Sequence, residues 1–347
     1  MIAPVWIRVP PEAYGGIELI VSLLVEGLVA KGHDVTLFAS GDSVTRAKLV
    51  SVYPQPQTEK MGSFLPNMFH VGSAYDCCRQ DDFDIIHDHT SYWGAVFGPH
   101  MDKPVLVTLH GELNSSTIPL LKKFKDAVYY NAVSENQRRL LPELRYVKTV
   151  RNTIDFGSFT VQTDKRGYLL SFSRICPEKG IHIAIEVSKE SGKPLIIAGK
   201  IDNRYPEYFK NMIEPQVDGV NIQFLGEVSA RQKRDLMSGA DCLLFPIQWD
   251  EPFGLVMLES MACGTPVVAF DRGATAEVII SGQNGFVVES VAQMVGVLDR
   301  CSSIDPLVCR RWVETNFSID RMIDGYLENY YNILHTEGQI GRSLNAA

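Results

Sequence analysis

Residues 241–270 alternate between strand-like and helix-like patterns, and this alternation limits the fold more than any other feature of the chain. The apolar runs at its two ends are short and rich in Leu, Val and Phe, as buried strands are. Between them, Pro252 suits the first position of a helix, and Gly264 suits the position just past a helix end. The stretch 253–263 is therefore expected to be a helix that connects two parallel strands.

The same alternation recurs along the 347 residues and predicts an α/β protein with parallel sheets, divided into two Rossmann-like domains. The expected strands are 2–7, 34–39, 84–87, 105–109, 127–133, 168–172, 194–198, 221–224, 241–245 and 267–270. The expected helices are 17–30, 182–191, 253–263 and about 318–335. The expected domains are 1–155, 156–317 and a C-terminal helical segment, 318–347, that packs back on the first domain.

Composition excludes several classes of protein. The net charge of -8 argues against a nucleic-acid partner. The seven cysteines show no CxxC spacing, which favours reduced, mostly buried thiols in a cytosolic protein. No run of 18 apolar residues predicts a membrane span, and the first residues lack the pattern of a signal peptide. A cytoplasmic protein is expected.

Two glutamates mark the expected helix, Glu251 before it and Glu259 inside it. A helix that begins at the carboxyl end of a strand lies where open α/β sheets bind ligands. The amides of Phe253, Gly254 and Leu255 are expected to bind an anion there, most naturally a phosphate. A glycosidase needs two carboxyls about 5 Å or about 6.5–9.5 Å apart, whereas eight helical residues rise about 12 Å. The two acids are therefore interpreted as separate contacts along an extended ligand, receiving sugar and ribose hydroxyls.

The residues EPFGLVMLESMACGTPVV, with Glu-x7-Glu, resemble the donor-site signature of retaining GT-B glycosyltransferases of family 4. The resemblance implies two Rossmann-like domains with a deep cleft between them, the first for the acceptor and the second for a nucleotide-sugar. It implies that Glu251 touches the donor sugar and that Glu259 binds the ribose. It also implies catalysis without a metal ion, and no cofactor is expected beyond the nucleotide-sugar co-substrate.

Residues 171–180 follow an expected strand and open a helix, with Arg174 and Lys179 at the strand's carboxyl end. A diphosphate leaving group needs positive charge as its bond to the sugar breaks. Arginine offers a bidentate fork and lysine a point charge. In the family that the chain resembles, an Arg and a Lys at this spacing hold the donor diphosphate.

Gly15 and Gly16 lie between the first strand and the first helix, where glycine lets backbone approach a ligand closely. A glycine pair alone is as compatible with a plain turn. Beside the other motifs it resembles the family's N-terminal glycine loop, which faces the donor phosphate and the acceptor. It is not GxGxxG, which argues against a dinucleotide oxidoreductase.

His110 follows a strand in VLVTLHG and resembles the family's THG-type motif, whose histidine contacts the donor sugar. The triplet His87-Asp88-His89 formally suggests a metal site, because strand alternation places both histidines on one face. No fourth ligand accompanies them, so no metal is expected. His89 is predicted to line the acceptor cleft.

The remaining site predictions rest mainly on the resemblance. Gly199 and Val228 stand where the family has donor-side loops, with Val228 near the expected base pocket, usually that of uracil. Residues 152–155 resemble the family's N-G-I-D hinge, with Thr153 in place of the glycine. Tyr92 and Trp93 could stack on a ring of the acceptor, or belong to the core.

The acceptor itself is not readable from the sequence, and a saccharide, a lipid and a small metabolite stay open. Residues 115–151 carry eight basic residues against three acids, a local net charge of +5. A solvated helix face explains such a region, and the alternative is weak peripheral contact with an anionic acceptor or the inner membrane face.

The expected reaction moves a hexosyl group from a nucleotide-diphosphate sugar, most simply a UDP-sugar, to an acceptor while keeping the anomeric configuration. His110, Glu251, Arg174 and Lys179 are the expected catalytic residues. Two alternatives are a GT-B-fold sugar-nucleotide epimerase, which would convert the donor without an acceptor, and a non-catalytic nucleotide-binding protein.

Overall fold

The computed structural model of the chain describes residues 1–12 and 15–338. It divides into two compact units, one made of Met1–Ile154 with the stretch from Ile319 onward, the other of Asp155–Ser318. Each division lies one residue from its expected position, so the chain leaves the first unit inside the expected hinge, 152–155. Tyr14 of the glycine loop and residues 339–347 of the C-terminal segment lie outside the described residues.

The first unit is built on parallel strands joined in two groups. The strands are β1 (Thr36–Phe38), β2 (Lys48–Val50), β3 (Ile86–Asp88), β4 (Val105–Leu109) and β5 (Tyr129–Ala132). Residues 1–3 bridge the groups, because Ile2 N donates to His87 O at 2.9 Å and Ala3 N donates to Phe38 O at 3.0 Å. From this segment the chain runs to β1 on one side and later to β3 on the other, so the strand order reverses there.

The expected strand 2–7 is wrong beyond its first residues. Only Ile2 forms bridges, to Phe38 and Asp88, and no strand is assigned to residues 4–7. Pro4 follows after Ala3, and a proline has no N–H to give to a ladder inside a sheet. The segment therefore connects two groups of strands through a short bridge and then leaves the sheet.

Helices surround this sheet, and the sequence predicted only the first and last of them. They are α1 (Gly16–Ala30), α2 (Phe64–Gln80), α3 (Tyr92–Phe97), α4 (Thr117–Lys123), α5 (Glu135–Leu140) and α13 (Ile319–Thr336), with short 3-10 turns η1 (Thr58–Lys60) and η2 (Gly98–His100). Helix α1 ends as predicted, with Gly32 just beyond it at a φ of 88°. Buried residues of α2, α3, β4 and β5 form one apolar core cluster.

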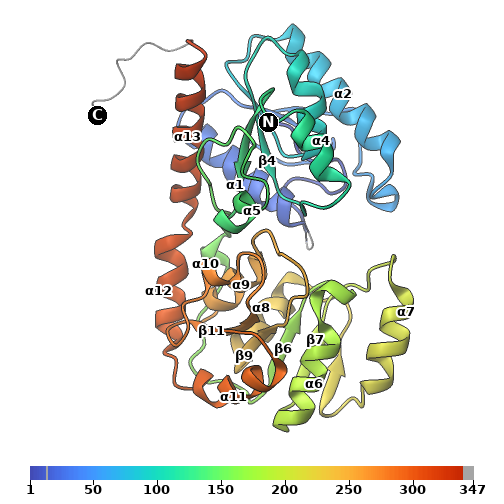
Figure 1. Cartoon of the computed structure of the whole chain (residues 1–347), viewed down its shortest axis with the longest axis vertical. Helices are drawn as coiled ribbons and strands as arrows, with labels where there is room; N and C mark the ends of the chain where they lie inside the picture. The colour runs from blue at the N-terminus through green and yellow to red at the C-terminus, as the bar shows by residue number, and fades with distance from the viewer. Residues whose placement is uncertain (13–14, 339–347) are drawn as a thin grey trace. The chain divides into compact units, whose positions relative to one another are not determined.

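Helix α13 belongs to the first unit although it comes last in the chain. It lies along α1, as Figure 1 shows, and Gly27 of α1 leaves room for Ile323, whose Cδ1 would be 2.1 Å from a Cβ at that position. Asn329 accepts from Lys148 N at 3.1 Å and donates to Lys148 O at 3.0 Å. The apolar face of α13 is thus buried on the first unit, which is where the sequence placed the C-terminal helix.

The second unit holds one six-stranded parallel sheet in the order β11-β10-β9-β6-β7-β8. Its strands are β6 (Leu169–Phe172), β7 (Leu195–Ala198), β8 (Ile222–Phe224), β9 (Cys242–Phe245), β10 (Val267–Phe270) and β11 (Gly285–Val288). The chain moves outward from β6 to β8 on one side, then returns to β9 on the other. The order therefore reverses between β6 and β9, and in open α/β sheets such a point is where ligands bind.

The helices of the second unit connect these strands. They are α6 (Ile181–Ser191), α7 (Pro206–Tyr208), α8 (Ala230–Gly239), α9 (Leu255–Ala262), α10 (Thr275–Val278), α11 (Val291–Cys301) and α12 (Pro306–Asn316). Short turns are η3 (Phe156–Ser158), η4 (Pro177–Lys179), the π-turn η5 (Phe209–Ile213) and η6 (Glu214–Gln216). All seven cysteines of the chain are free thiols, six of them buried, in line with the expectation from their spacing.

Helix α9 begins later than the sequence predicted. Leu255 is its first residue, and Gly254 precedes it with a φ of 86°, so Pro252 does not occupy the first helical position. Phe253 is buried and packs against Phe317, with ring centroids 5.8 Å apart. The helix end agrees with the prediction, because Gly264 adopts a φ of 72° and its N donates to Met261 O at 2.9 Å.

Candidate active site

Charged side chains gather in the second unit where the strand order reverses. Arg174 and Lys179 follow the carboxyl end of β6, and Glu251 follows the carboxyl end of the neighbouring strand β9. All strands of this sheet are parallel, so their carboxyl ends share one edge. The structure thus brings three sequence-predicted catalytic residues to the same edge of the second unit.

Lys179 and Glu251 form an ion pair, with Nζ 2.5 Å from Oε2. Both side chains are largely buried, and the ammonium also lies 5.2 Å from the ring centroid of Trp249 and 5.8 Å from that of Phe245. Aromatic faces attract a cation, so the lysine is held from two directions. An ammonium has three N–H donors, and the single bond to Glu251 leaves it able to bind an anion as well.

Backbone packing fixes the position of Lys179. Gly180 ends η4 and begins α6 with a φ of 67°, and a Cβ there would be 2.0 Å from Pro246 O. The loop after β9 is tied to the same turn, because Gln248 N donates to Glu178 O at 2.8 Å. The turn that carries Lys179 and the loop that carries Glu251 are therefore packed directly on each other.

Arg174 is held by carboxylates rather than left open. Its guanidinium pairs with Asp202, and Glu178 lies 4.0 Å away. Asp202 also receives Arg204, with Nη2 2.7 Å from Oδ2. Hydrogen bonds from Arg204 are the largest cause that holds the pKa of the Asp202 carboxyl well below its usual range. Asp202 was not identified from the sequence, and no motif marks it.

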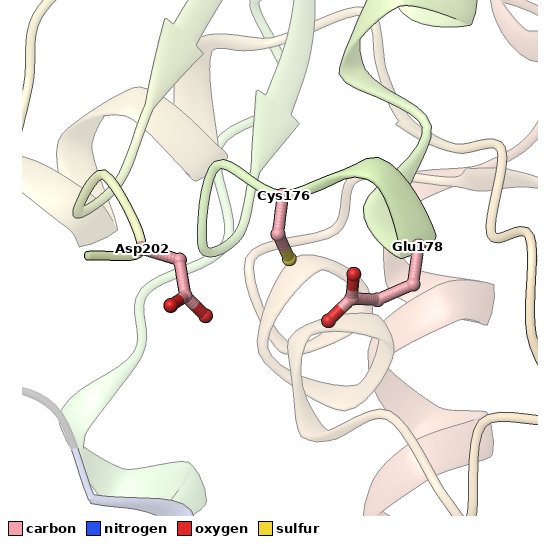
Figure 2. Close-up of side chains that lie close together, drawn as sticks. All are labelled: Cys176, Glu178 and Asp202. Carbon is pink, nitrogen blue, oxygen red and sulfur yellow. The ribbon is translucent and has the colours of Figure 1, made fainter. Parts of the chain in front are cut away.

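Figure 2 shows that the side chains of Cys176, Glu178 and Asp202 lie close together. One possible ligand atom of each lies within 4.8 Å of those of the other two. The chemistry of the group does not suit a metal ion. Two guanidinium groups already occupy the Asp202 carboxylate, and burial raises the pKa of the Cys176 thiol to about 12. A thiol binds metal only as the thiolate, so the three residues are better understood as a support for Arg174.

Glu259 lies within α9 and is buried, and it pairs with Lys233 of α8. Lys233 also lies 5.4 Å from the ring centroid of Phe172 at the end of β6. This lysine is a site residue that the sequence did not reveal, because it belongs to an ordinary amphipathic helix and no motif distinguishes it from its neighbours. The two glutamates thus use different lysines from different elements, which supports reading them as separate ligand contacts.

The sequence-based estimate of about 12 Å between Glu251 and Glu259 assumed helical rise along the whole stretch. The residues before Leu255 are not helical, so the estimate does not apply to them. The later start of α9 also changes which amides open the helix. They are those of Leu255 and Val256, while Met257 N donates to Gly254 O at 3.0 Å. Among the three amides predicted to bind an anion, only that of Leu255 is a helical one.

Glycines at the same edge allow close backbone packing. A Cβ on Gly199, after β7, would be 1.8 Å from Ser173 O, and Gly199 has a φ of 145°. Gly273, after β10, abuts the backbone of Glu251, where a Cβ would be 2.2 Å from the carbonyl oxygen. Val228 lies half-buried in the loop between β8 and α8. Gly199 and Val228 therefore stand on strand-end loops of the second unit, as predicted.

The first unit carries its own strand-end residues. His89 follows β3 and His110 follows β4, and His89 Nδ1 is 2.8 Å from His110 Nε2. His87 and His89 share a face, as predicted, with ring centroids 4.0 Å apart. His89 is fully buried and contacts His110, which is itself partly buried, so the prediction that His89 lines an acceptor cleft is wrong. Burial lowers the pKa of His110 to about 3 and that of His89 well below its usual value.

The glycine loop opens helix α1. Gly15 has a φ of 150°, and a Cβ there would be 2.8 Å from Pro11 Cβ, while Gly16 is the first residue of the helix. Glu18 in the first turn is buried, and this raises the pKa of its carboxyl to about 7. A protonated carboxyl at a helix start can donate a hydrogen bond as well as accept one.

Tyr92 and Trp93 take different positions in α3. Trp93 is buried in the apolar core, with ring centroids 5.0 Å from Phe64 and 6.4 Å from Phe97, so its prediction as an acceptor-stacking residue is wrong and the core alternative holds. Tyr92 is exposed and lies 5.4 Å from Trp93. Neighbouring side chains of a helix point in different directions, so Trp93 faces the core while Tyr92 faces solvent.

Much of the positive charge in residues 115–151 is neutralised within the first unit. Lys122 pairs with Glu143 at 2.8 Å, Lys148 pairs with Glu328 of α13, and Arg145 pairs with Glu337 at 3.3 Å. Among the described residues, no helix combines the length and the apolar character needed to cross a membrane. The contacts favour the reading of this region as a solvated, internally paired surface.

Comparison with known proteins places the chain in a family. Residues 14–156 match the model of Glycosyltransferase Family 4, and residues 157–301 match that of Glycosyl transferases group 1. The chain is 30% identical over 324 residues to the putative glycosyltransferase YtcC of Bacillus subtilis, covering 81% of this chain and 76% of that protein.

Two solved structures share the fold. One is AviGT4, a glycosyltransferase involved in avilamycin A biosynthesis (24% identity, TM-score 0.72, 95% of this chain and 93% of that one). The other is Anabaena Alr3699/HepE in complex with UDP and glucose (19% identity, TM-score 0.71, 91% and 96%). Together with the two α/β units and their parallel sheets, these matches show that the chain belongs to the GT-B glycosyltransferases of family 4.

Proposed function

We propose that this glycosyltransferase moves a hexosyl group from a UDP-sugar to an acceptor hydroxyl or amine, with retention of the anomeric configuration. The observation that carries the proposal is the Lys179–Glu251 pair at the point where the strand order of the second unit reverses. It sets a cation for phosphate beside a carboxylate for hydroxyls, which a sugar joined to a diphosphate requires. The HepE structure with UDP and glucose supports UDP as the nucleotide.

In this proposal, the charged groups of the candidate site contact different parts of the donor. Arg174 and Lys179 bind the diphosphate, together with the amides at the start of α9. Glu251 accepts hydrogen bonds from the sugar, and Glu259 accepts them from the ribose hydroxyls. The Lys233 ammonium holds the Glu259 side chain in place, because removing one member of a buried ion pair leaves the other uncompensated.

Bond-making follows from this arrangement. The bond between the anomeric carbon and the phosphate oxygen breaks while the acceptor oxygen attacks from the same face, and the acceptor proton passes to the leaving phosphate. Arg174 and Lys179 stabilise the negative charge that develops on that phosphate. No metal ion is needed where two cations do this, so the reaction is proposed to continue in the presence of a chelator. His110 of the first unit contacts the sugar.

Nucleotide selection is the first test of the proposal. Thermal-shift and calorimetric titrations with UDP-, GDP- and ADP-sugars should single out a UDP-sugar, because a ligand that binds only the folded state raises its melting temperature. Lys179→Met and Glu259→Gln should each weaken binding at least about tenfold, the loss expected for one charge-assisted hydrogen bond. Glu190→Gln, an exposed acid on α6, is the matched control and should bind as the parent does.

Product analysis is the second test. Incubation with a cell extract fraction as acceptor source and a labelled UDP-sugar should release UDP, and NMR coupling constants of the product should show the donor's anomeric configuration. Full turnover in EDTA supports a metal-independent reaction. An inverted product would refute retention while leaving the transferase assignment intact.

Two other functions predict different outcomes in these assays. A sugar-nucleotide epimerase would convert the UDP-sugar into its epimer with no acceptor present. A non-catalytic nucleotide-binding protein would bind UDP without consuming any donor.

Weak peripheral membrane contact is proposed only for the exposed part of the basic region, through residues such as Lys123 and Arg139. Co-sedimentation with anionic vesicles, lost at high salt, would support it.

A further inference from the structure

Three histidines of the first unit form a connected group at the ends of β3 and β4. His110 Nε2 is 2.8 Å from His89 Nδ1, and His89 Nε2 is 3.0 Å from the Met1 sulfur. The ring centroid of His87 lies 4.0 Å from that of His89, with the rings tilted by 39°, and the His87 nitrogens are held by Thr108 Oγ1 and Tyr330 OH, each at 2.7 Å. Every ring nitrogen of His87 and His89 therefore has a fixed neighbour.

The Met1 sulfur decides where the His89 proton lies. A thioether has no hydrogen to donate and can only accept. Two lone pairs facing each other at 3.0 Å would repel, so His89 carries its hydrogen on Nε2 and donates it to the sulfur. His87 does not impose a tautomer, because both of its partners are hydroxyls that can donate or accept.

The state of His110 follows from that of His89. Burial lowers the pKa of His89 well below its usual value, which keeps the ring neutral, so its Nδ1 is an acceptor. The hydrogen between the two rings therefore belongs to His110 Nε2. Burial also lowers the pKa of His110, to about 3, so this ring is neutral as well and its Nδ1 carries a lone pair. Among residues 1–12 and 15–338, no hydrogen bond to that nitrogen is found.

We propose that His89 is a positioning residue that holds His110 in the Nε2–H tautomer, so that His110 Nδ1 accepts a hydrogen bond from a hydroxyl group of the ligand. This inference rests on the proposed function for the identity of the ligand, a sugar. It adds a requirement on the ligand's chemistry: the group that meets His110 must donate a hydrogen. A phosphate or carbonyl oxygen would face a lone pair and be repelled.

The lowered pKa of His110 also bears on proton transfer. A ring whose pKa is about 3 is a poor base at neutral pH, because the best catalytic pKa lies near the operating pH. His110 thus recognises a hydroxyl without removing its proton. That assignment fits a reaction in which the leaving phosphate takes the acceptor proton.

The direct test is the tautomer of His110 in the substrate-free protein. Long-range 1H–15N correlation of 15N-histidine-labelled full-length protein distinguishes the ring nitrogens, because Nε2 couples to two ring protons and Nδ1 mainly to one. Both His89 and His110 should show the hydrogen on Nε2 between pH 6 and 8. A hydrogen on His110 Nδ1, or a charged ring at pH 6, would overturn the proposal. This readout needs no activity, so it stands apart from the proposed function.

Variants of His89 test its role. An asparagine places its amide near the site of Nδ1, so His89→Asn keeps an acceptor for His110, whereas His89→Leu removes it. His89→Leu should let His110 populate both tautomers and weaken UDP-sugar binding about tenfold, which is the loss expected for one hydrogen bond. His89→Asn should keep the Nε2–H tautomer and bind within about threefold of the parent. If His89→Leu kept the single tautomer, His89 would not be what selects it. Should His89→Leu fail to fold, the spectra of the parent and His89→Asn decide alone.

Fluorinated donors test the hydroxyl. Fluorine cannot donate a hydrogen, so one monofluoro UDP-sugar in a positional series should bind the parent about tenfold more weakly than the hydroxyl compound. The same substitution should cost nothing further in His110→Ala, and UDP alone should bind both proteins equally. Equal losses in parent and variant at every position would show that His110 meets no donating hydroxyl. Absence of UDP-sugar binding in the parent would refute the proposed function and leave the tautomer result untouched.

Discussion

Two glycines show how a backbone contact constrains a single residue at the candidate site. Gly180 and Gly192 bound the same helix, α6, and both adopt a left-handed conformation, at φ 67° and 68°. A Cβ on Gly180 would be 2.0 Å from Pro246 O, whereas nothing lies within 4 Å of a Cβ on Gly192. An alanine at either position would have a strained left-handed backbone, but only an alanine at 180 would also clash with a neighbour. Comparing the two substitutions therefore separates the two effects.

Gly180→Ala should destabilise the second unit by more than about 3 kcal/mol, since it adds a clash to the left-handed strain of about 1–2 kcal/mol. Gly192→Ala should cost only the strain. Urea unfolding followed by pulsed hydrogen exchange of α6 peptides measures both. UDP-sugar affinity should fall in Gly180→Ala alone, since Lys179 precedes this glycine. Equal destabilisation by the two substitutions would contradict the contact with Pro246.

Glu18 offers a residue-scale prediction for pH. Burial raises the pKa of its carboxyl from 4.5 to about 7, so in the folded protein it keeps a proton that the unfolded chain has already lost. Stability is therefore lost as pH rises from about 4.5 to 7. Glu18→Gln should raise the free energy of unfolding by about 1–3 kcal/mol at pH 8 and change it little at pH 4. Hydrogen-exchange protection of α1 peptides measures this change in stability, and Glu190→Gln, which replaces an exposed acid, is the control. A gain in stability that did not depend on pH would contradict the raised pKa of Glu18.

At the scale of elements, the last helix is fastened to the first unit by polar groups within an apolar face. Asn329 is fully buried and pairs with both backbone groups of Lys148. Tyr326 OH receives Asn131 at 3.2 Å, and Tyr330 OH contacts His87 at 2.7 Å. Helix α13 thereby contacts β3 and β5 and contributes to the surroundings of the histidine group.

Asn329→Ala should lower the stability of the first unit by about 1–3 kcal/mol, because it removes two partly buried hydrogen bonds to the Lys148 backbone. Asn332→Ala removes an exposed amide from the same helix and should change stability by less than about 0.5 kcal/mol. Exchange protection of α13 should fall in the first variant only. Similar protection in both would mean that the Asn329 amide does not anchor the helix.

At the scale of the whole molecule, two units with separate sheets make global unfolding a poor single measure. All proposed contacts to uridine and ribose lie in the second unit. UDP at about a hundred times its dissociation constant should therefore stabilise that unit by about 2.7 kcal/mol. Hydrogen exchange should slow in peptides covering 174–180 and 251–262 and remain unchanged in 127–133. Equal slowing in all three regions would place the nucleotide elsewhere.

The sequence by itself determined the class of fold, the donor-site motif and most strand positions. Strands β4 and β10 have the predicted bounds, and Gly264 ends α9 as predicted, because periodicity and capping act within a few residues of the chain. It missed the start of α9, where buried Phe253 and left-handed Gly254 override the preference of Pro252. It also missed the break after Ile2, where one proline removed a strand that its apolar neighbours suggested.

Only the tertiary structure decided the partners of the site residues. Lys233 meets Glu259, Asp202 meets Arg174, and the Met1 sulfur meets His89, across chain separations of 26, 28 and 88 residues. Such pairs depend on the order in which strands join a sheet, and no local pattern encodes that order. The sequence thus named the groups proposed to bind a nucleotide-sugar, while the sheet order decided which partners orient and support each of them.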